Sequence, residues 1–331
     1  MMKKILLATL LIASSLSPAS ISSSQAQSLL ICLAYDVGGP GDNSFNDAAQ
    51  SGLRVAASEL QFTLETTVTS GEPKDRKDRL TALVKKDCAI VIAVGSAYAP
   101  TLKELSQEFP EQQFAILNDA TVDALNVTSI AFADVQGAYL AGFSAALASK
   151  SGRVAMIGNP SEKALFDRGF LPGAKAARKS ITATHRSVSG SATSTTSALL
   201  RSGHDVIYLA TIGSATDVFS VIAASNRAGK TRFSAGLITK EPDQFLTVDA
   251  ESKKFLLATV VKRLDLALID LVSVTLAGNA LYDEVDPVLG VYGYRYGISD
   301  KSIEITLRSP VLIAARAKIN AASVAASKLR V

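Results

Sequence analysis

The sequence predicts an α/β protein with two lobes, each built on a parallel sheet that is covered by helices. At 331 residues the chain exceeds the length at which a single hydrophobic core usually stops growing. Hydrophobic residues make up 48% and charged residues 19%, which is typical of a globular chain. Short apolar runs alternate with segments of helical periodicity, and this alternation is the pattern of parallel strands connected by helices.

The first lobe is predicted from a series of strand, loop and helix units. An apolar run at 29–35 ends in a turn-forming cluster at 36–42, and helical periodicity follows at 46–60. The unit then recurs, with strands expected at 62–68, 89–95 and 114–117 and helices at 74–85 and 99–108. Because each strand is apolar along its length, we expect both faces of this sheet to be buried.

A second series of the same kind predicts the other lobe. It starts after a strand at 128–132, with helices expected at 136–150, 164–179 and 215–228 and strands at 154–158 and 206–210. Residues 187–197 are rich in Ser, Thr and Gly, and they are predicted to form a surface loop that leads into a helix.

The late part of the chain is expected to serve both lobes. A long helix is predicted at 259–276, followed by strands at 290–296 and 303–307. The chain then crosses between the lobes several times, which places a ligand cleft beyond the carboxyl ends of the strands. The expected first lobe is 27–132 with 256–287, and the expected second lobe is 133–255 with 288–331.

Residues 1–26 have the composition of a secretory signal peptide. Lys3 and Lys4 precede an apolar run at 5–13, and small residues lead up to Ala26, which predicts cleavage after Ala26. An uncleaved membrane anchor is the alternative, but the apolar run is well short of the ~20 residues that a span needs. We therefore expect an exported protein in the periplasm, outside the cell or at the cell surface.

The balance of charges argues against a nucleic-acid partner. Without Lys3 and Lys4 the chain has 32 basic and 30 acidic residues, so the exported form is nearly neutral. The basic residues are dispersed along the sequence, whereas a nucleic-acid surface needs a concentrated basic patch.

The two cysteines, Cys32 and Cys88, each precede or begin an apolar run. An exported protein can form a disulfide, but thiols in strand cores are usually buried and inert, so we expect two free cysteines. Two thiols without a nearby histidine fall short of the four ligands that zinc requires. Neither a metal ion nor any other cofactor is expected.

Most enzyme classes lack their necessary residues. Only two histidines occur, His185 and His204, both in polar surroundings, and no nucleophile elbow, phosphate-binding loop or paired-histidine metal motif is present. Glycines at 38–41 follow the first strand, but their spacing is wrong for a dinucleotide loop and a proline removes one amide donor. Asp36 and Asp42 are too few carboxylates for the calcium site of a nucleoside hydrolase.

The loop after the first strand has a different chemistry, suited to a flat heterocycle. Asp36 and a pair of glycines are followed by Ser44, Phe45 and Asn46 at the start of a helix. An aromatic face beside amide and carboxylate groups can bind a heterocyclic base. The alternative is structural: Ser44 or Asn46 caps the helix, and Phe45 packs against the core.

Residues 34–46, with the sequence AYDVGGPGDNSFN, resemble the N-terminal signature of the basic membrane protein family. These are nucleoside-binding receptors of ABC transporters, related to the purine nucleoside receptor A lipoprotein. Further matching segments follow in the family's order, at 94–96, 114–119, 137–142, 152–158, 166–170, 205–207 and 260–265. The resemblance implies the type I periplasmic-binding-protein architecture, with several crossings between the lobes.

The resemblance also implies a set of ligand contacts. The base would lie between the rings of Phe45 and Phe166, with its edge on Asp36, on Asn46, and on either Asp119 or Asn118. The ribose would be held by the backbone near Gly213, by an acid after Gly236, and by Lys262.

This chain departs from the family pattern at three places. Ile238 stands where the family has its ribose-binding Asp, so Asp243, after an insertion, is the candidate substitute. Residues 211–214 replace the usual paired glycines before the ribose-binding turn. No cysteine precedes Cys32, and a bulky Ile31 stands before it, so we expect a cleaved protein without a lipid anchor.

The expected function is that of an extracytoplasmic solute-binding protein. It would be a monomer that captures a nucleoside, preferentially a purine nucleoside, in the cleft and presents the closed form to an ABC permease. Three alternatives stay open: a receptor of the same fold for sugars or other small molecules, an enzyme of the nucleoside hydrolase kind, and a signalling receptor that does not transport.

Overall fold

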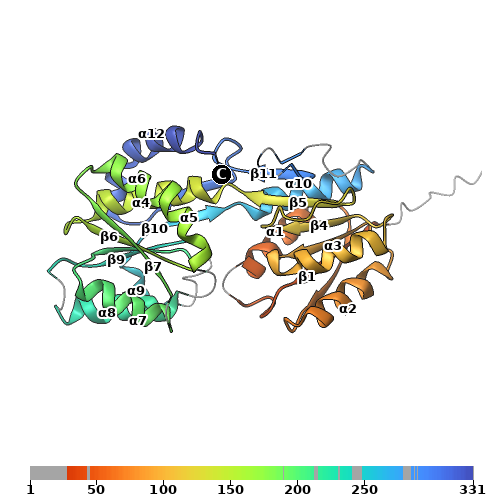
Figure 1. Ribbon diagram of the computed structural model, residues 1–331, viewed down its shortest axis with the longest axis horizontal. Helices are drawn as coiled ribbons and strands as arrows, with labels where there is room; N and C mark the ends of the chain where they lie inside the picture. The colour runs from red at the N-terminus through yellow and green to blue at the C-terminus, as the bar shows by residue number, and fades with distance from the viewer. Residues whose placement is uncertain are drawn as a thin grey trace, which may run out of the picture.

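The computed structural model describes residues 28–42, 45–188, 190–211, 215–229, 232–240, 248–278, 285–286, 288 and 290–330. The chain forms two α/β lobes that lie side by side, and the segments that connect them run along one edge of the molecule (Figure 1). Within these described ranges, each lobe contains one six-stranded sheet. The predicted fold class is confirmed.

The first lobe is built on a sheet with the strand order β11-β5-β4-β3-β1-β2, in which every pair is parallel. Its strands are β1 (Leu30–Tyr35), β2 (Thr63–Val68), β3 (Ile90–Val94), β4 (Phe114–Leu117), β5 (Val127–Phe132) and β11 (Gly293–Tyr296). The helices that cover it are α1 (Phe45–Glu59), α2 (Pro73–Val84), α3 (Ala99–Glu108) and α10 (Leu264–Leu276), with the short turn η1 (Ser96–Tyr98). The inner strands are buried on both faces, as their continuous apolar runs require.

The second lobe has a sheet with the order β12-β10-β9-β8-β6-β7, parallel except for the antiparallel pair of β10 and β12. Its strands are β6 (Arg153–Gly158), β7 (Thr182–Ser187), β8 (Val206–Leu209), β9 (Gly236–Thr239), β10 (Leu256–Lys262) and β12 (Ile303–Leu307). Its helices are α4 (Asp134–Ala148), α5 (Lys163–Leu165), α6 (Leu171–Ala177), α7 (Ala192–Arg201), α8 (Thr216–Arg227), α9 (Ala250–Lys253), α11 (Pro310–Ala314) and α12 (Arg316–Ala326), together with η2 (Pro160–Glu162) and the π-helical turn η3 (Phe166–Phe170).

Helices α4 and α6 cross at very short range, and glycines make this crossing possible. A Cβ on Gly142 would lie 2.0 Å from the carbonyl oxygen of Phe170, and a Cβ on Gly173 would lie 2.0 Å from that of Tyr139. No other residue type fits at such a distance, so these glycines set how η3 and α6 sit on α4.

Several predicted elements were wrong in detail. The helix expected at 259–276 is a strand up to Lys262 followed by α10, because the β-branched Thr259, Val260 and Val261 favour a strand. The helix expected at 164–179 is divided into α5, η3 and α6. Strands β7 and β9 were not predicted, since β7 is a partly exposed edge strand and β9 has only two large apolar residues, Leu237 and Ile238.

The late strands also lie on the opposite sides of the expected lobe boundaries. β10, within 256–287, pairs with β9 in the second sheet, and β11, within 288–331, pairs with β5 in the first. The chain crosses between the lobes after β5, after β10 and between β11 and β12. Helix α10, which follows the second crossing, packs against α1 as expected for the first lobe.

The expectation of two free cysteines was wrong. Cys32 in β1 and Cys88 just before β3 form a disulfide, with their Cα atoms 5.8 Å apart. β1 and β3 are adjacent parallel strands, with Cys32 opposite Val91, so the sheet brings the two thiols together. Sequence spacing alone does not show that these strands are neighbours.

Candidate ligand-binding cleft

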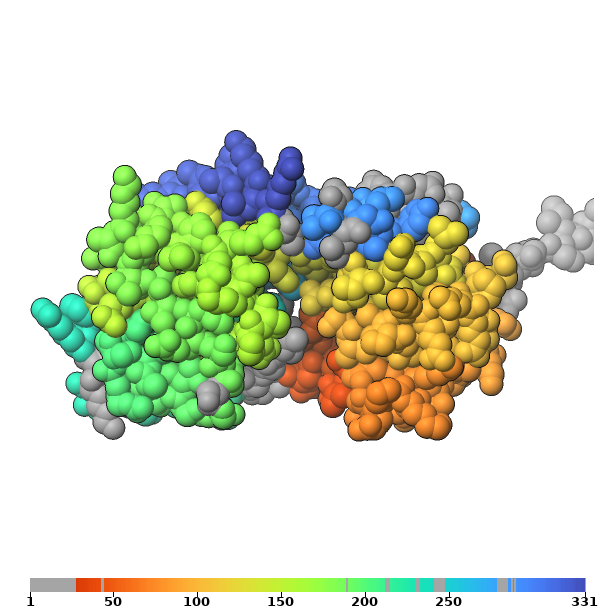
Figure 2. Space-filling view, viewed as in Figure 1, coloured from red at the N-terminus to blue at the C-terminus, as the bar shows by residue number. Residues whose placement is uncertain are grey.

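Two adjoining cavities lie between the lobes, where the strands of both sheets end. The larger has a volume of about 400 Å³ and the smaller about 140 Å³. Asn118, after β4, and Lys240, after β9, line both cavities, which therefore form one cleft. Figure 2 shows the hollow between the lobes. The position agrees with the cleft predicted beyond the carboxyl ends of the strands.

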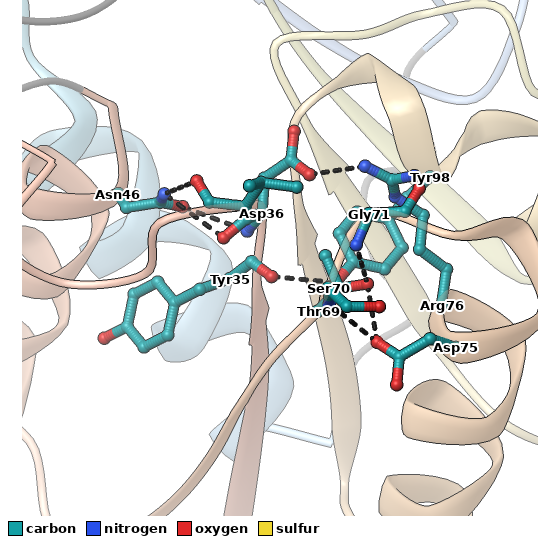
Figure 3. Close-up of polar contacts among 10 residues, drawn as sticks. Tyr35, Asp36, Asn46, Thr69, Ser70, Gly71, Asp75, Arg76 and Tyr98 are labelled. Atoms are coloured by element: carbon teal, nitrogen blue, oxygen red, sulfur yellow. Dashed lines mark hydrogen bonds and ion pairs between the residues drawn. The ribbon is translucent and has the colours of Figure 1, made fainter.

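The loop between β1 and α1 is held by the side chain of Asn46. Its Oδ1 accepts a hydrogen bond from the backbone N–H of Asp36 at 3.0 Å, and its Nδ2 donates to the carbonyls of Asp36 at 3.4 Å and Val37 at 3.3 Å (Figure 3). Asn46 is only 3% exposed. The structure therefore places this amide within the loop, where it fixes the backbone of Asp36, although Asn46 also borders the smaller cavity.

Asp42 caps the start of α1. Its two carboxylate oxygens accept from the backbone N–H groups of Asn46 at 3.2 Å and Asp47 at 3.3 Å. An acidic cap satisfies donors that the first helical turn leaves unpaired, and its charge suits the positive end of the helix. The sequence had suggested Ser44 or Asn46 for this task; Ser44 lies outside the described residues, and Asn46 bonds within the loop instead.

The carboxylate of Asp36 lies at the edge of the smaller cavity and pairs with an arginine. Asp36 Oδ1 accepts from Arg76 Nη2 at 2.6 Å (Figure 3). Arg76 comes from α2, 40 residues further along the chain. No sequence motif pointed to this arginine, because only the parallel pairing of β1 with β2 brings α2 to the end of β1.

Lys262 is the most enclosed charge of the cleft, with a side chain that is 2% exposed. Its Nζ donates to Asn118 Oδ1 at 2.8 Å and pairs with Asp134 Oδ1 at 2.7 Å. It also lies 5.4 Å from the ring centroid of Phe132 and 5.9 Å from that of Phe45. Lys262 ends β10 and Asp134 begins α4, so this ion pair links two of the crossings between the lobes.

Burial alone would raise the pKa of the Asp134 carboxyl, since it penalises the charged form. The nearby ammonium groups of Lys262 and Lys240 outweigh this effect, and the pKa of Asp134 is lowered. The cleft therefore holds an ionised carboxylate beside an ammonium group, a pairing that can both donate to and accept from the hydroxyl groups of a ligand.

The structure distinguishes the two residues between which the sequence could not choose. Asn118 adopts a left-handed backbone conformation with φ 62°, borders both cavities and contacts Lys262. The carboxylate of Asp119 accepts from the backbone N–H of Thr121 at 2.8 Å and from its hydroxyl at 2.7 Å, and borders only the larger cavity. Asn118 is thus the residue beside the smaller cavity.

The structure does not bring Phe45 and Phe166 together. Phe45 is 9% exposed and borders the smaller cavity. Phe166 is 6% exposed, and its ring lies 5.9 Å from that of Phe170 and 5.7 Å from that of His185. Its ring contacts are thus with residues of the second lobe, and the neighbouring Leu165 borders the larger cavity in its place.

Two of the expected ribose contacts, Gly213 and Asp243, lie outside the described residues. Ile238, at the family's acidic position, is fully buried within β9. Two residues further, Lys240 enters the cleft and forms an ion pair with Glu162 at 3.7 Å. Sequence reasoning missed Lys240 because it missed the strand that ends beside it.

The described residues contain no cluster arranged to bind a metal ion. No group of three or more His, Cys, Asp or Glu in these ranges is arranged to hold a metal ion. His204 is buried rather than in a polar loop, with its ring nitrogens 3.2 Å from the Leu199 carbonyl and 3.1 Å from the Thr184 hydroxyl. No helix in the described part of the chain is both long and apolar enough to cross a membrane.

Two parallel-rich sheets, several chain crossings and a polar cleft at the strand ends define a two-lobed protein of the kind that closes on small ligands. The family model of PnrA-like substrate-binding proteins of ABC transporters matches residues 32–322, and the chain belongs to this family. The resemblance seen in the sequence is thereby confirmed.

Similar proteins agree with this assignment. The "CD4+ T-cell-stimulating antigen" of Listeria innocua is 28% identical over 265 residues, which cover 75% of this chain and 74% of that protein. The "ABC transporter nucleoside-binding protein BmpA" of Lactococcus lactis is 27% identical over 266 residues, 76% of each chain. A solute-binding protein of an ABC transporter system from Aeropyrum pernix K1 shares the fold, with a TM-score of 0.70, 19% identity, and coverage of 91% of this chain and 90% of that one.

Proposed function

We propose that this protein captures a nucleoside, with a preference for purines, and delivers it to an ABC permease. The observation that carries the proposal is the polar and aromatic lining of the smaller cavity, which combines Asp36, Phe45, Asn118 and Lys262 in a member of this family. A carboxylate and an amide suit the edge of a base, and a phenyl ring suits its face. The adjacent pair of Lys262 and Asp134 suits the hydroxyl groups of a ribose.

Closure of the lobes would complete the site. The smaller cavity holds about 140 Å³ and adjoins the larger one, of about 400 Å³, which Leu165, next to Phe166, borders. A ligand drives closure only through its higher affinity for the closed form. We place Phe166 against the second face of the base in that form, and we retain Gly213 and Asp243 as ribose contacts and Asn46 as a residue of the base pocket.

The proposed protein works outside the cytoplasm as a monomer, after removal of residues 1–26 and without a lipid anchor. It acts as a carrier and not as an enzyme, so it releases its ligand unchanged. Intact-mass measurement of the exported protein tests the first point, because cleavage after Ala26 and lipid attachment give different masses.

A thermal-shift panel tests the ligand. Purified residues 27–331 are heated with nucleosides, free bases or sugars, each at a range of concentrations. A ligand that binds only the folded state raises the melting temperature, by an amount that corresponds to about 2.7 kcal/mol at a hundred times its Kd. We expect purine nucleosides to give the largest shift. A shift with sugars and none with nucleosides would contradict the proposal and favour a sugar receptor of the same fold.

A further inference from the structure

Arg76 lies behind the cavity-facing carboxylate of Asp36 and is almost enclosed by protein. Its side chain is 11% exposed, compared with 33% for Asp36. Nη2 donates to Asp36 Oδ1 at 2.6 Å, and Nη1 donates to the carbonyl oxygen of Gly71. The guanidinium carbon lies 5.3 Å from the ring centroid of Tyr98, whose hydroxyl donates to the Tyr35 carbonyl at 2.8 Å. The arginine is therefore held from three directions (Figure 3).

The loop that receives Arg76 is itself fixed. Asp75 accepts from the N–H of Ser70 at 2.8 Å and from the hydroxyl of Thr69 at 2.9 Å. Gly71 has φ 103°, which favours glycine, and a Cβ there would lie 2.8 Å from a methyl group of Val37. The position of the Gly71 carbonyl, and hence of the guanidinium, is set by local structure before any ligand binds.

Stability alone does not explain this arginine. Its Nε is buried and has no hydrogen-bond partner among the described residues. Burial of a guanidinium with an unpaired donor is unfavourable, and a buried ion pair is often no more stable than apolar side chains of the same volume. The arrangement is better explained by its effect on Asp36.

Arg76 leaves one oxygen of Asp36 for the cavity. Oδ1 is occupied, whereas no described residue donates a hydrogen bond to Oδ2. A Cβ on Gly95 would lie 3.5 Å from Oδ2, so the glycine leaves the approach to this oxygen open. We propose that Arg76 is a positioning residue, which orients the Asp36 carboxylate so that Oδ2 is presented to the ligand as a fixed, charged acceptor.

This inference rests on the proposed function and narrows the class of ligand. A carboxylate accepts hydrogen bonds and cannot donate them. The preferred nucleosides are therefore those whose base has an N–H group on the edge that faces Asp36, such as the ring N–H of inosine or the amino group of adenosine. Purine riboside has neither group, and it would leave Oδ2 unpaired in the closed cleft.

Isothermal titration calorimetry with inosine, adenosine and purine riboside tests the role of Arg76. The proteins are the wild type, Arg76→Met, Arg76→Lys, Asp36→Asn and the double variant Arg76→Met/Asp36→Asn. We expect Arg76→Met to weaken binding of inosine or adenosine roughly tenfold, as for the loss of one hydrogen bond to a charged group, and to leave purine riboside unchanged. Arg76→Lys should retain part of the affinity, because one ammonium group cannot replace both donors of the guanidinium fork.

The double variant separates positioning from a general structural effect. If Arg76 acts through Asp36, Arg76→Met adds no further loss of affinity in the Asp36→Asn background. Arg54→Met, at an exposed arginine of α1 in the same lobe, is the matched control and should bind like the wild type. If Arg76→Met does not fold, Arg76→Lys is titrated with the same three nucleosides. A loss of affinity for inosine and adenosine without a loss for purine riboside then supports the role of Arg76 through Asp36.

The following results would overturn the inference. Equal losses for all three nucleosides, or losses that add in the double variant, contradict a role through Asp36. Wild-type protein that binds none of the three contradicts the proposed function and this inference with it. Wild-type binding without any selective loss in the Arg76 variants contradicts the inference alone.

Discussion

The two sides of the cleft, called here its first and second wall, differ in what holds their side chains in place. The first wall, at the end of β1, has its polar groups fixed by neighbours: Asn46 holds the backbone of Asp36, and Arg76 holds its carboxylate. The second wall, at η3, has its aromatic residue Phe166 against the rings of Phe170 and His185 of the same lobe. Under the proposed function, the first wall would recognise the ligand, and the second wall would move against it when the lobes close.

Removal of the disulfide should have the largest effect on stability. It tests how far the first lobe, which carries the first wall at the end of β1, is stabilised by this bond. The bond between Cys32 and Cys88 closes a loop with a sequence separation of 56 residues. Its loss should lower the free energy of unfolding by about 4 kcal/mol on the chain-entropy estimate. The measurement is chemical denaturation of the Cys32→Ala/Cys88→Ala variant. An unchanged midpoint would contradict a stabilising role for the bond.

Phe166→Ala should lower the stability of the protein almost as much, because it removes a buried ring from the second lobe. We expect a loss of about 3 kcal/mol or more in the free energy of unfolding. Phe166→Leu keeps most of the apolar volume, so it should be much more stable. If Phe166 stacks on the base in the closed form, Phe166→Leu nonetheless weakens nucleoside binding, and Phe45→Leu does the same. Binding unaffected by Phe166→Leu would remove this residue from the site.

Lys262→Met should have an intermediate effect on stability and a strong effect on binding. The variant leaves Asp134 without its ammonium partner, and breaking a fully buried pair costs about 3–5 kcal/mol. Asp134 is 33% exposed, so water would reduce the cost to about 2 kcal/mol. Lys254→Met, in an exposed pair with Glu251, is the control and should change stability by less than about 1 kcal/mol. Equal losses in both variants, measured by denaturation, would argue against a special role for Lys262.

The pH dependence of Asp75 should be the smallest effect. The Ser70 N–H and Thr69 hydroxyl lower the pKa of this carboxyl from 3.8 to about 2. Because the folded-state pKa is the lower one, the stabilisation is complete above pH 3.8 and is lost as the pH falls towards 2. Between pH 5 and pH 2, the melting temperature of the wild type should therefore fall slightly more than that of Asp75→Asn. Parallel melting curves would show that the loop at 69–71 does not depend on this carboxylate.

The sequence was sufficient for the architecture where strands were continuous apolar runs. β1, β3 and β4 are continuous apolar runs next to clear turns, and their predicted ranges agree with the structure to within a few residues. β7 and β9 were missed because β7 is a half-exposed edge strand and β9 has only two large apolar residues, Leu237 and Ile238, so neither gives a clear apolar run. The residue after β9, Lys240, was missed for the same reason.

The residues of the site, too, could be predicted from the sequence only in part. Asp36, Phe45, Asn118 and Lys262, which the family resemblance named as ligand contacts, all line the smaller cavity, and their contact with a ligand stays a prediction. Arg76 could not be predicted, since its contact with Asp36 spans 40 residues and depends on the pairing of β1 with β2. The disulfide is a second example, because it depends on which strands are neighbours. Local patterns predict elements, whereas contacts between elements require the topology.

The most direct test is a crystal structure of the protein grown with inosine. Under the proposed function, the base lies between the rings of Phe45 and Phe166, Phe166 has left its contacts with Phe170 and His185, and a base N–H group faces Asp36 Oδ2. A cleft without the nucleoside, or a bound nucleoside with Phe166 still packed in the core of the second lobe, would contradict capture by two opposed rings.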